Sequence, residues 1–118
     1  MLNVSVATMN SEIVIWNECI NDNRKIHLYW DEKIGMWCAF GISAFGIVVW
    51  LKENNTEDNS HYSEEMCMPV TLLSMDRLMC MAQNAADIEE MTGTYVCLKM
   101  AREVDIEIYS AWAGHLRN

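Results

Sequence analysis

Residues 34–51 form a run of eighteen residues without a charged side chain, and this run constrains the fold more than any other feature of the chain. Lys33 and Lys52 bound the run, and Trp37 and Trp50 lie near its ends. Its length and its terminal tryptophans suit a helix that spans a membrane. It also contains three glycines, and the buried strands of a sheet are often continuously apolar too. We therefore expect buried strands here, with a single membrane span at 34–51 as the alternative.

The segments around this run predict an antiparallel hairpin. Residues 25–30 have the pattern of a strand, 31–35 form a loop that ends in glycine, and 36–40 form the returning strand. Two glycines bracket residues 41–46, where we expect a bend or bulge. Residues 47–51 then continue as a buried strand, because they are apolar and partly β-branched.

The N-terminal segment is ambiguous. Residues 2–9 alternate apolar and small polar groups, which suggests a short strand. Ser11 could cap a helix that would place Ile13, Trp16 and Ile20 on one face. The β-branched residues that follow Ser11 favour a strand equally. The pattern alone does not separate the two.

The second half begins with a polar segment. Residues 53–65 have no apolar periodicity and predict a mobile loop. Residues 66–73 predict a strand, whose Pro69 suits an edge strand or the start of a strand. Residues 94–100 predict another strand.

Two helices are predicted, at 75–92 and 105–117. Ser74 caps the first helix, which ends at Thr92 and Gly93. Asp105 is a possible N-cap of the second. The apolar face of the first comprises Met75, Leu78, Met79, Ala82, Ala85 and Ala86. That of the second comprises Ile106, Tyr109, Ala113 and Leu116, with Ile108 and Trp112 beside them.

The order of these elements predicts the α+β class. We expect one domain over residues 1–118, with an antiparallel sheet of four to six strands and the helices 75–92 and 105–117 packed on one face. The length of 118 residues suits a single domain.

The charge of the chain limits its partners. Seventeen acidic residues face eight basic ones, which gives a formal net charge of -9. Binding of nucleic acids and of anionic membranes depends on positive charge, so neither is expected. The predicted partner is a basic protein, or a metal cation.

The five cysteines indicate a reducing compartment. Their number is odd and no two have C-x-x-C spacing, so a disulfide framework is not expected. The N-terminus has no basic segment of the kind that begins a signal peptide. We therefore expect free thiols and a cytoplasmic protein.

No motif predicts a catalytic site, a metal site or a cofactor. The repeated Met-Cys-Met triplets at 66–68 and 79–81 carry soft ligands for copper, but their side chains diverge in a strand or a helix. His61 lies among acidic residues without any recognised metal-binding spacing. Residues 41–46 miss the G-x-S-x-G pattern by one position, so Ser43 is interpreted as a bulge residue.

Two groups of carboxylates are the candidate partner-binding residues, together with two aromatic anchors. From Glu53 to Asp76 there are six acidic residues and no lysine or arginine. Three further acids crowd the last turns of the predicted helix 75–92, where the helix dipole disfavours them. Local rules broken without compensation often indicate function. The candidates are Glu57, Asp58, Glu64, Glu65, Asp87, Glu89 and Glu90, with Tyr109 and Trp112 as apolar anchors.

These features favour a small acidic, non-enzymatic protein that binds and inhibits a basic protein, such as a nucleic-acid-binding enzyme or a toxin. Bacterial immunity proteins and phage-encoded anti-defence inhibitors share this size and charge, which is an analogy of class only. The alternatives are a small enzyme or ligand-binding domain with an unmarked pocket, and the single-span membrane protein.

Overall fold

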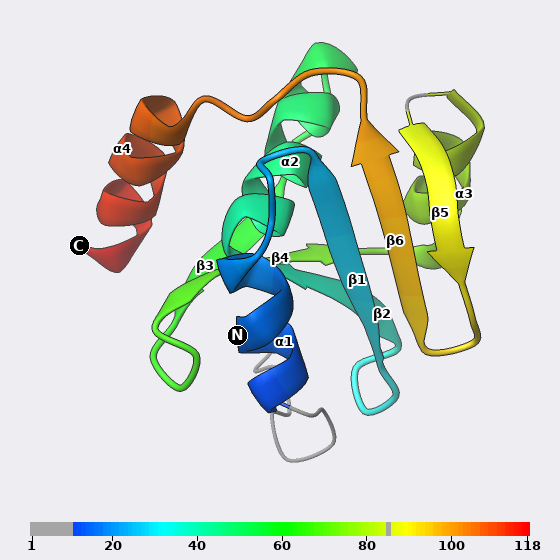
Figure 1. The fold of residues 1–118 in the computed structure, drawn as a ribbon, viewed down its shortest axis with the longest axis horizontal. Helices are drawn as coiled ribbons and strands as arrows, with labels where there is room; N and C mark the ends of the chain where they lie inside the picture. The colour runs from blue at the N-terminus through cyan, green and yellow to red at the C-terminus, as the bar shows by residue number, and fades with distance from the viewer. Residues whose placement is uncertain (1–10, 85) are drawn as a thin grey trace.

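The computed structural model describes residues 11–84 and 86–118, and it shows an α+β fold (Figure 1). The helices are α1 (Ser11–Cys19), α2 (Gly41–Glu53), α3 (Met75–Asn84) and α4 (Ile106–Arg117). The strands are β1 (Lys25–Asp31), β2 (Met36–Phe40), β3 (Asn59–Ser63), β4 (Met68–Leu73), β5 (Ala86–Met91) and β6 (Tyr95–Met100). The predicted class is confirmed, with four helices among the described residues where two were expected.

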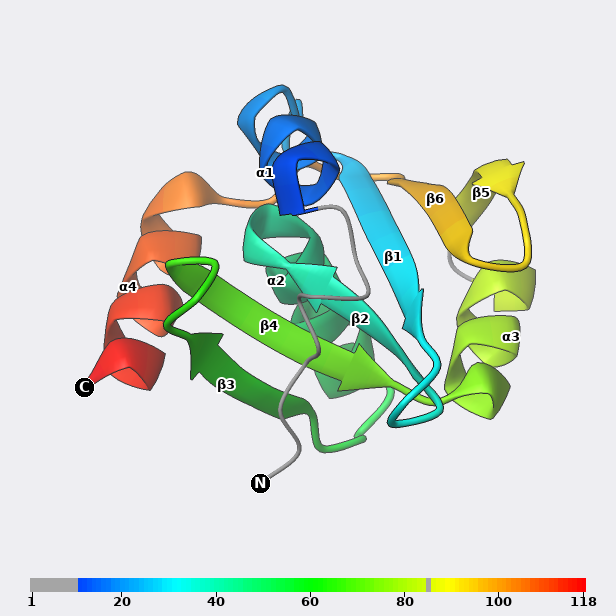
Figure 2. The same ribbon diagram turned by 90° about the horizontal axis from the view of Figure 1, so that it is seen from below.

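The six strands form one antiparallel sheet in the order β3-β4-β2-β1-β6-β5 (Figure 2). The strands β3 and β5 are therefore its two edges. The pairing of β1 with β6 joins Tyr29 to Tyr95 across a long stretch of chain. The hairpin of β1 and β2 was predicted, and Gly35 in its turn has the positive φ of 63° that glycine tolerates.

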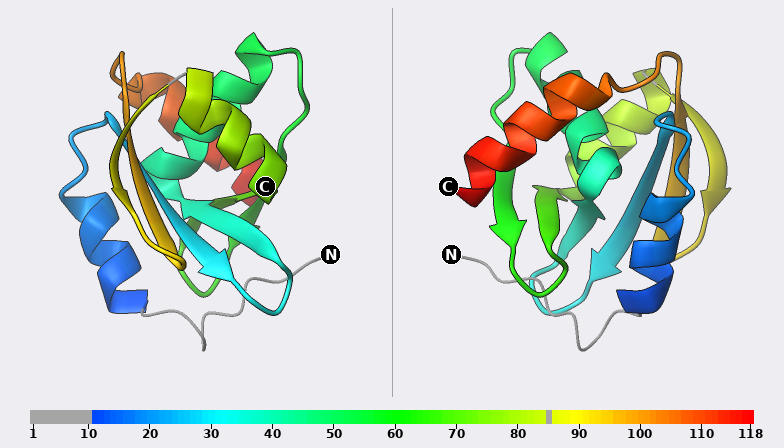
Figure 3. Two further views of the ribbon diagram at one scale, coloured as in Figure 1. Left: turned by 90° about the vertical axis from the view of Figure 1, so that its right-hand side faces the viewer. Right: turned by 60° about the vertical axis from the view of Figure 1, so that its left-hand side comes forward.

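The two faces of the sheet are covered differently (Figure 3). Helices α2, α3 and α4 lie on one side and α1 lies on the other. Because side chains alternate along a strand, Ile26 and Leu28 of β1 pack with Ile47 of α2. Tyr29 points to the opposite side, where it packs with Val14 of α1.

The apolar run 34–51 contains β2 and then the buried helix α2. The bend predicted at 41–46 and the strand predicted at 47–51 are therefore wrong. Gly41, with a φ of 57°, lets the chain pass directly from β2 into α2. A helix that is apolar on all sides has no periodicity that distinguishes it from a buried strand. Among the described residues, no helix is both long enough and apolar enough to cross a bilayer, and 34–51 is not one helix.

The helix predicted at 75–92 ends at Asn84. Its last third is instead the strand β5, and the residues after β5 form the turn into β6. Leu78 is buried as predicted, whereas Met75 and Met79 are 45% and 44% exposed. Met81 takes their place in the core. The pairing of β5 with β6 overrides the helical spacing of the sequence.

Two other predictions have clear outcomes, and a third is not tested. The polar loop 53–65 contains the edge strand β3, which pairs with β4 and joins Ser60 to Thr71 by a hydroxyl hydrogen bond of 2.7 Å. The N-terminal ambiguity resolves as the helix α1, whose expected face of Ile13, Trp16 and Ile20 is exposed. The strand predicted at 2–9 lies outside the described residues.

Helix α4 is confirmed with its cap. The carboxylate of Asp105 accepts hydrogen bonds from the backbone N–H groups of Glu107 and Ile108, at 2.9 and 3.1 Å. These bonds satisfy donors that the first turn of a helix leaves free.

Candidate functional site

One face of the β1-β6-β5 half of the sheet carries a group of polar side chains that contact one another. The register places Lys25, His27 and Tyr29 of β1 directly opposite residues of β6. Residues opposite each other in a ladder share a face of the sheet. We call this surface the polar face; it comprises Lys25, His27, Tyr29, Tyr95, Cys97, Lys99, Asp87, Glu89 and Glu90.

A β-bulge in β5 lets three carboxylates share the polar face. Asp87 lies opposite Lys99, Glu90 lies opposite Cys97, and the register shifts between Ile88 and Glu90. Asp87 and Glu90 therefore share the face of their β6 partners. A regular strand would place them on opposite faces, because they are three positions apart.

Glu89 is the extra residue of the bulge. Its carboxylate forms an ion pair with the Nζ of Lys25, which shows that it also faces the polar side. The Sγ of Cys97 lies 4.0 Å from the same carboxylate. The three acids were expected in the last turns of a helix, where the helix dipole would disfavour them. They lie in a strand instead, and lysines of β1 and β6 partly neutralise their charge.

The centre of the polar face holds a histidine, a tyrosine and a thiol. The Nδ1 of His27 lies 2.6 Å from the hydroxyl of Tyr95, and the two rings stack at 6.0 Å. Burial lowers the pKa of His27, so the imidazole is uncharged at neutral pH. Burial likewise raises the pKa of the Cys97 thiol. A nucleophilic cysteine needs the thiolate form, and this environment disfavours it.

Beside the polar face, Glu18 and Ser43 join α1 to α2. The Oγ of Ser43 donates to Oε2 of Glu18 at 2.6 Å, and the Ser43 N–H donates to Oε1 at 3.1 Å. The same Oγ accepts the N–H of His27 at 2.9 Å. Ser43, which was expected in a bulge, is therefore a buried residue in the first turn of α2. Burial raises the pKa of Glu18 to about 7, against these hydrogen bonds, which lower it.

The other predicted acids lie at the far edge of the sheet. Glu57 and Asp58 precede β3, and Glu64 and Glu65 lie in the turn between β3 and β4. Five strand spacings separate β3 from β5, which is about 24 Å at the usual spacing. The structure therefore does not bring the two predicted acidic groups together.

The two aromatic anchors face inward. Tyr109 and Trp112 are half-buried, with ring centroids 6.0 and 5.1 Å from that of Phe45. On the same helix, Ile106 and Ile108 are 45% and 59% exposed instead.

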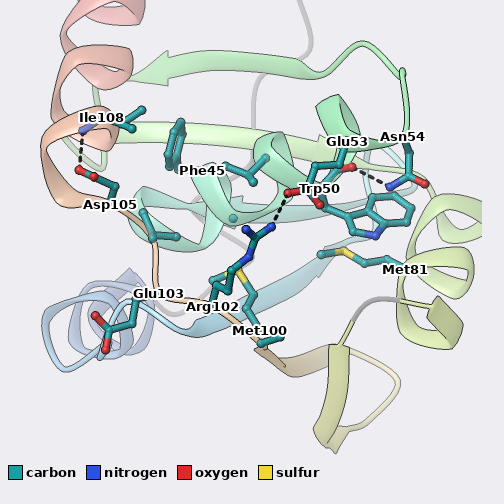
Figure 4. A pocket seen from close by; sticks show the side chains of 14 residues that line it. Phe45, Trp50, Glu53, Asn54, Met81, Met100, Arg102, Glu103, Asp105 and Ile108 are labelled. Carbon is teal, nitrogen blue, oxygen red and sulfur yellow. Dashed lines mark hydrogen bonds and ion pairs between the residues drawn. The ribbon is translucent and has the colours of Figure 1, made fainter.

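A cleft of about 650 Å³ lies between α2 and the segment that joins β6 to α4 (Figure 4). Phe45, Trp50 and Met81 contribute to its apolar walls. At its rim, the guanidinium of Arg102 binds the carboxylate of Glu53 at 3.0 Å. No sequence pattern indicates this cleft, because its lining comes from three separate stretches of the chain, 45–54, Met81 and 100–108.

Metal-ligating side chains do not converge in the described part of the chain. Within residues 11–84 and 86–118, no three histidine, cysteine, aspartate or glutamate side chains are grouped as a metal ion requires. All five cysteines are free thiols in the structure; Cys38 and Cys97 are buried, and Cys19, Cys67 and Cys80 are exposed.

The polar face could have been predicted from the sequence only if the register of β1 against β6, and of β6 against β5, had been known.

Comparison with known proteins finds no matching family model, no matching curated protein and no matching solved structure.

Proposed function

We propose that this chain is a small acidic binding protein that engages and blocks a basic protein, such as a nucleic-acid-binding enzyme or a toxin, in a reducing cytoplasm. In this proposal the protein catalyses no reaction. Its carboxylates occupy positions on the partner that phosphates would otherwise take. The formal charge of -9 supports attraction to a cationic surface.

One observation carries the proposal: the polar face ends on a row of carboxylates. Asp87, Glu89 and Glu90 form its outermost row, whereas Lys25 and Lys99 lie on the strands inside it. An approaching protein therefore meets negative charge first at this edge. Complementary charge of this kind speeds association and excludes partners of like charge.

The polar face also contains the groups that an enzyme could use, but their protonation argues for binding. His27 and Cys97 lie opposite each other on neighbouring strands. Burial keeps the first uncharged and the second protonated. Hydrogen bonds and ring stacking then serve to hold the face rigid, which limits the entropy lost on binding.

The test compares two variants of equal net charge. The first, Asp87→Asn/Glu89→Gln/Glu90→Gln, neutralises the outermost row. The second, Glu57→Gln/Glu64→Gln/Glu65→Gln, removes as many charges at the opposite edge. Immobilised wild-type chain is used to capture a basic partner from the source cells, and the purified partner is then measured against all three chains.

We expect the first variant to slow association at low salt by at least about tenfold and to flatten its salt dependence. The second variant is expected to retain most of the wild-type rate. Equal association rates for wild type and the first variant would mean that the row serves only solubility, and the proposal would fail.

The cleft supports a second candidate function, the binding of a small apolar molecule. Its volume of about 650 Å³ lies within the usual range of small-molecule sites. Val49, which is 37% exposed, lines it, so Val49→Trp is expected to fill it. An apolar fluorescent dye should bind wild type and should bind the Val49→Trp variant much more weakly. The same affinity for both chains would rule out the cleft as its site.

A further inference from the structure

The outer edge of β5 is open. In the part of the chain that the structure describes, no strand pairs with this edge, and Figure 3 (left) shows no helix across it. Residues 87–91 are all exposed. An edge strand presents unpaired N–H and C=O groups, to which another strand can hydrogen-bond.

The opposite edge strand, β3, is less exposed. Helix α4 packs against β3, and the guanidinium of Arg117 lies over the ring of Tyr62 at 5.6 Å from its centroid. Covering an edge with a helix is one of the ways in which proteins prevent strand addition. Residues 60–63 of β3 are half-buried, whereas residues 87–91 of β5 are exposed although α3 also contacts β5, so β5 is the more open of the two edges.

The two faces of β5 have different chemistry because of the bulge. Asp87, Glu89 and Glu90 lie on the polar face. Ile88 and Met91, opposite core residues of β6, lie on the other face and are 48% and 47% exposed. A strand beside β5 would thus meet carboxylates on one face and apolar side chains on the other.

This arrangement selects the kind of strand that can pair. A second copy of β5 would bring carboxylates against carboxylates, and like charges directly opposite destabilise a ladder. A strand that alternates basic and apolar residues would satisfy both faces. Exposed apolar side chains on an edge are otherwise an aggregation hazard, which the carboxylates limit.

We propose that β5 binds the partner by strand addition: an extended segment alternating Lys or Arg with apolar residues pairs with the outer edge of β5. This inference rests on the proposed function and specifies how the basic partner is held. Backbone hydrogen bonds supply affinity in this mode, and the alternating side chains supply specificity. The carboxylates that oppose self-pairing select the basic segment.

The probes are three short synthetic peptides. The first alternates lysine and valine. The second has the same sequence with a methyl group on every backbone nitrogen, so that it keeps its charge but can donate to a neighbouring strand from neither edge. The third alternates glutamate and valine. Each is titrated into wild type, the Asp87→Asn/Glu89→Gln/Glu90→Gln variant and the Glu57→Gln/Glu64→Gln/Glu65→Gln control.

We expect the lysine–valine peptide to bind wild type and the control, and to slow amide hydrogen exchange within residues 86–91. N-methylation is expected to weaken binding by at least about tenfold, because the backbone hydrogen bonds are lost. The glutamate–valine peptide should not bind, and the β5 variant should bind the first peptide at least about tenfold more weakly.

Two outcomes overturn the inference and leave the proposed function standing. One is equal affinity for the first two peptides, with no protection of β5 amides. The other is absence of peptide binding while the captured basic protein still depends on the β5 carboxylates. If the captured protein associates with the β5 variant as fast as with wild type, the proposed function fails as well.

Discussion

The hydroxyl of Ser43 donates a hydrogen bond of 2.6 Å to Oε2 of Glu18, and this bond joins α1 to the first turn of α2. No local pattern pairs these two residues, which lie 25 positions apart. The bond places a carboxyl group at the N-terminus of a buried helix, where the helix dipole favours negative charge. Burial opposes ionisation at the same place.

Glu18 should make the stability of the protein depend on pH. Its pKa is raised from 4.5 to about 7 in the folded state, so the folded chain holds a proton that the unfolded chain has lost between these values. The contribution of Glu18 is therefore fully present below about pH 4.5 and is lost as the pH rises through about 7. Urea unfolding across this range should show a steeper fall for wild type than for Glu18→Gln. If the unfolding free energies of the two proteins changed with pH in parallel, the raised pKa of Glu18 would be contradicted.

Leu78→Ala should destabilise the protein by about 2–5 kcal/mol, because the side chain is 1% exposed and packs in the core between α2 and the sheet. Met79→Ala, one residue along the same helix, is the control; its side chain is 44% exposed and should cost under about 1 kcal/mol. Urea unfolding midpoints give both values. Similar losses for the two variants would mean that α3 is rotated from its described position.

Gly41→Ala should cost more than Gly35→Ala, although both glycines have positive φ values. The left-handed backbone alone costs about 1–2 kcal/mol in each case. A Cβ at Gly41 would also lie 3.2 Å from Oε1 of Glu18, whereas a Cβ at Gly35 has no atom within 4 Å. The difference between the unfolding free energies of the two variants measures the cost of this contact. Equal unfolding free energies would show that the side chain of Glu18 moves aside without cost.

The five cysteines should fall into two reactivity classes. Cys19, Cys67 and Cys80 are exposed, so they should react rapidly with a thiol reagent. Cys38 and Cys97 should react slowly, because burial raises the pKa of both and raises that of Cys38 to about 12. Denatured protein without reductant should show five thiols, and a count of three or one would mean that disulfides form.

Several elements could be predicted because neighbouring residues specify them. The loop ending in Gly35 and the strands on either side of it define a hairpin. The helix α4 begins where Asp105 can cap it. These interactions lie within a few residues of each other, so the sequence pattern contains them completely.

The errors fall where distant contacts decide the structure. Residues 47–51 have the composition of a buried strand, yet they form a helix that is enclosed between the sheet and other helices. Residues 86–91 continue a helical spacing, yet pairing with β6 makes them a strand. Asp87, Glu89 and Glu90 were selected because they would oppose the dipole of a helix, but that helix ends at Asn84 and the three acids lie in β5.

The sequence by itself determined the fold class, the negative charge and the local signals that begin and end most elements, because these follow from composition and short-range spacing. The tertiary structure alone decided which residues meet. The register of β6 against β1 and β5, with the bulge at Ile88 and Glu90, sets which side chains share the polar face. A shift of one residue in a strand moves its side chains to the other face, and only the summed packing of the whole sheet selects one register.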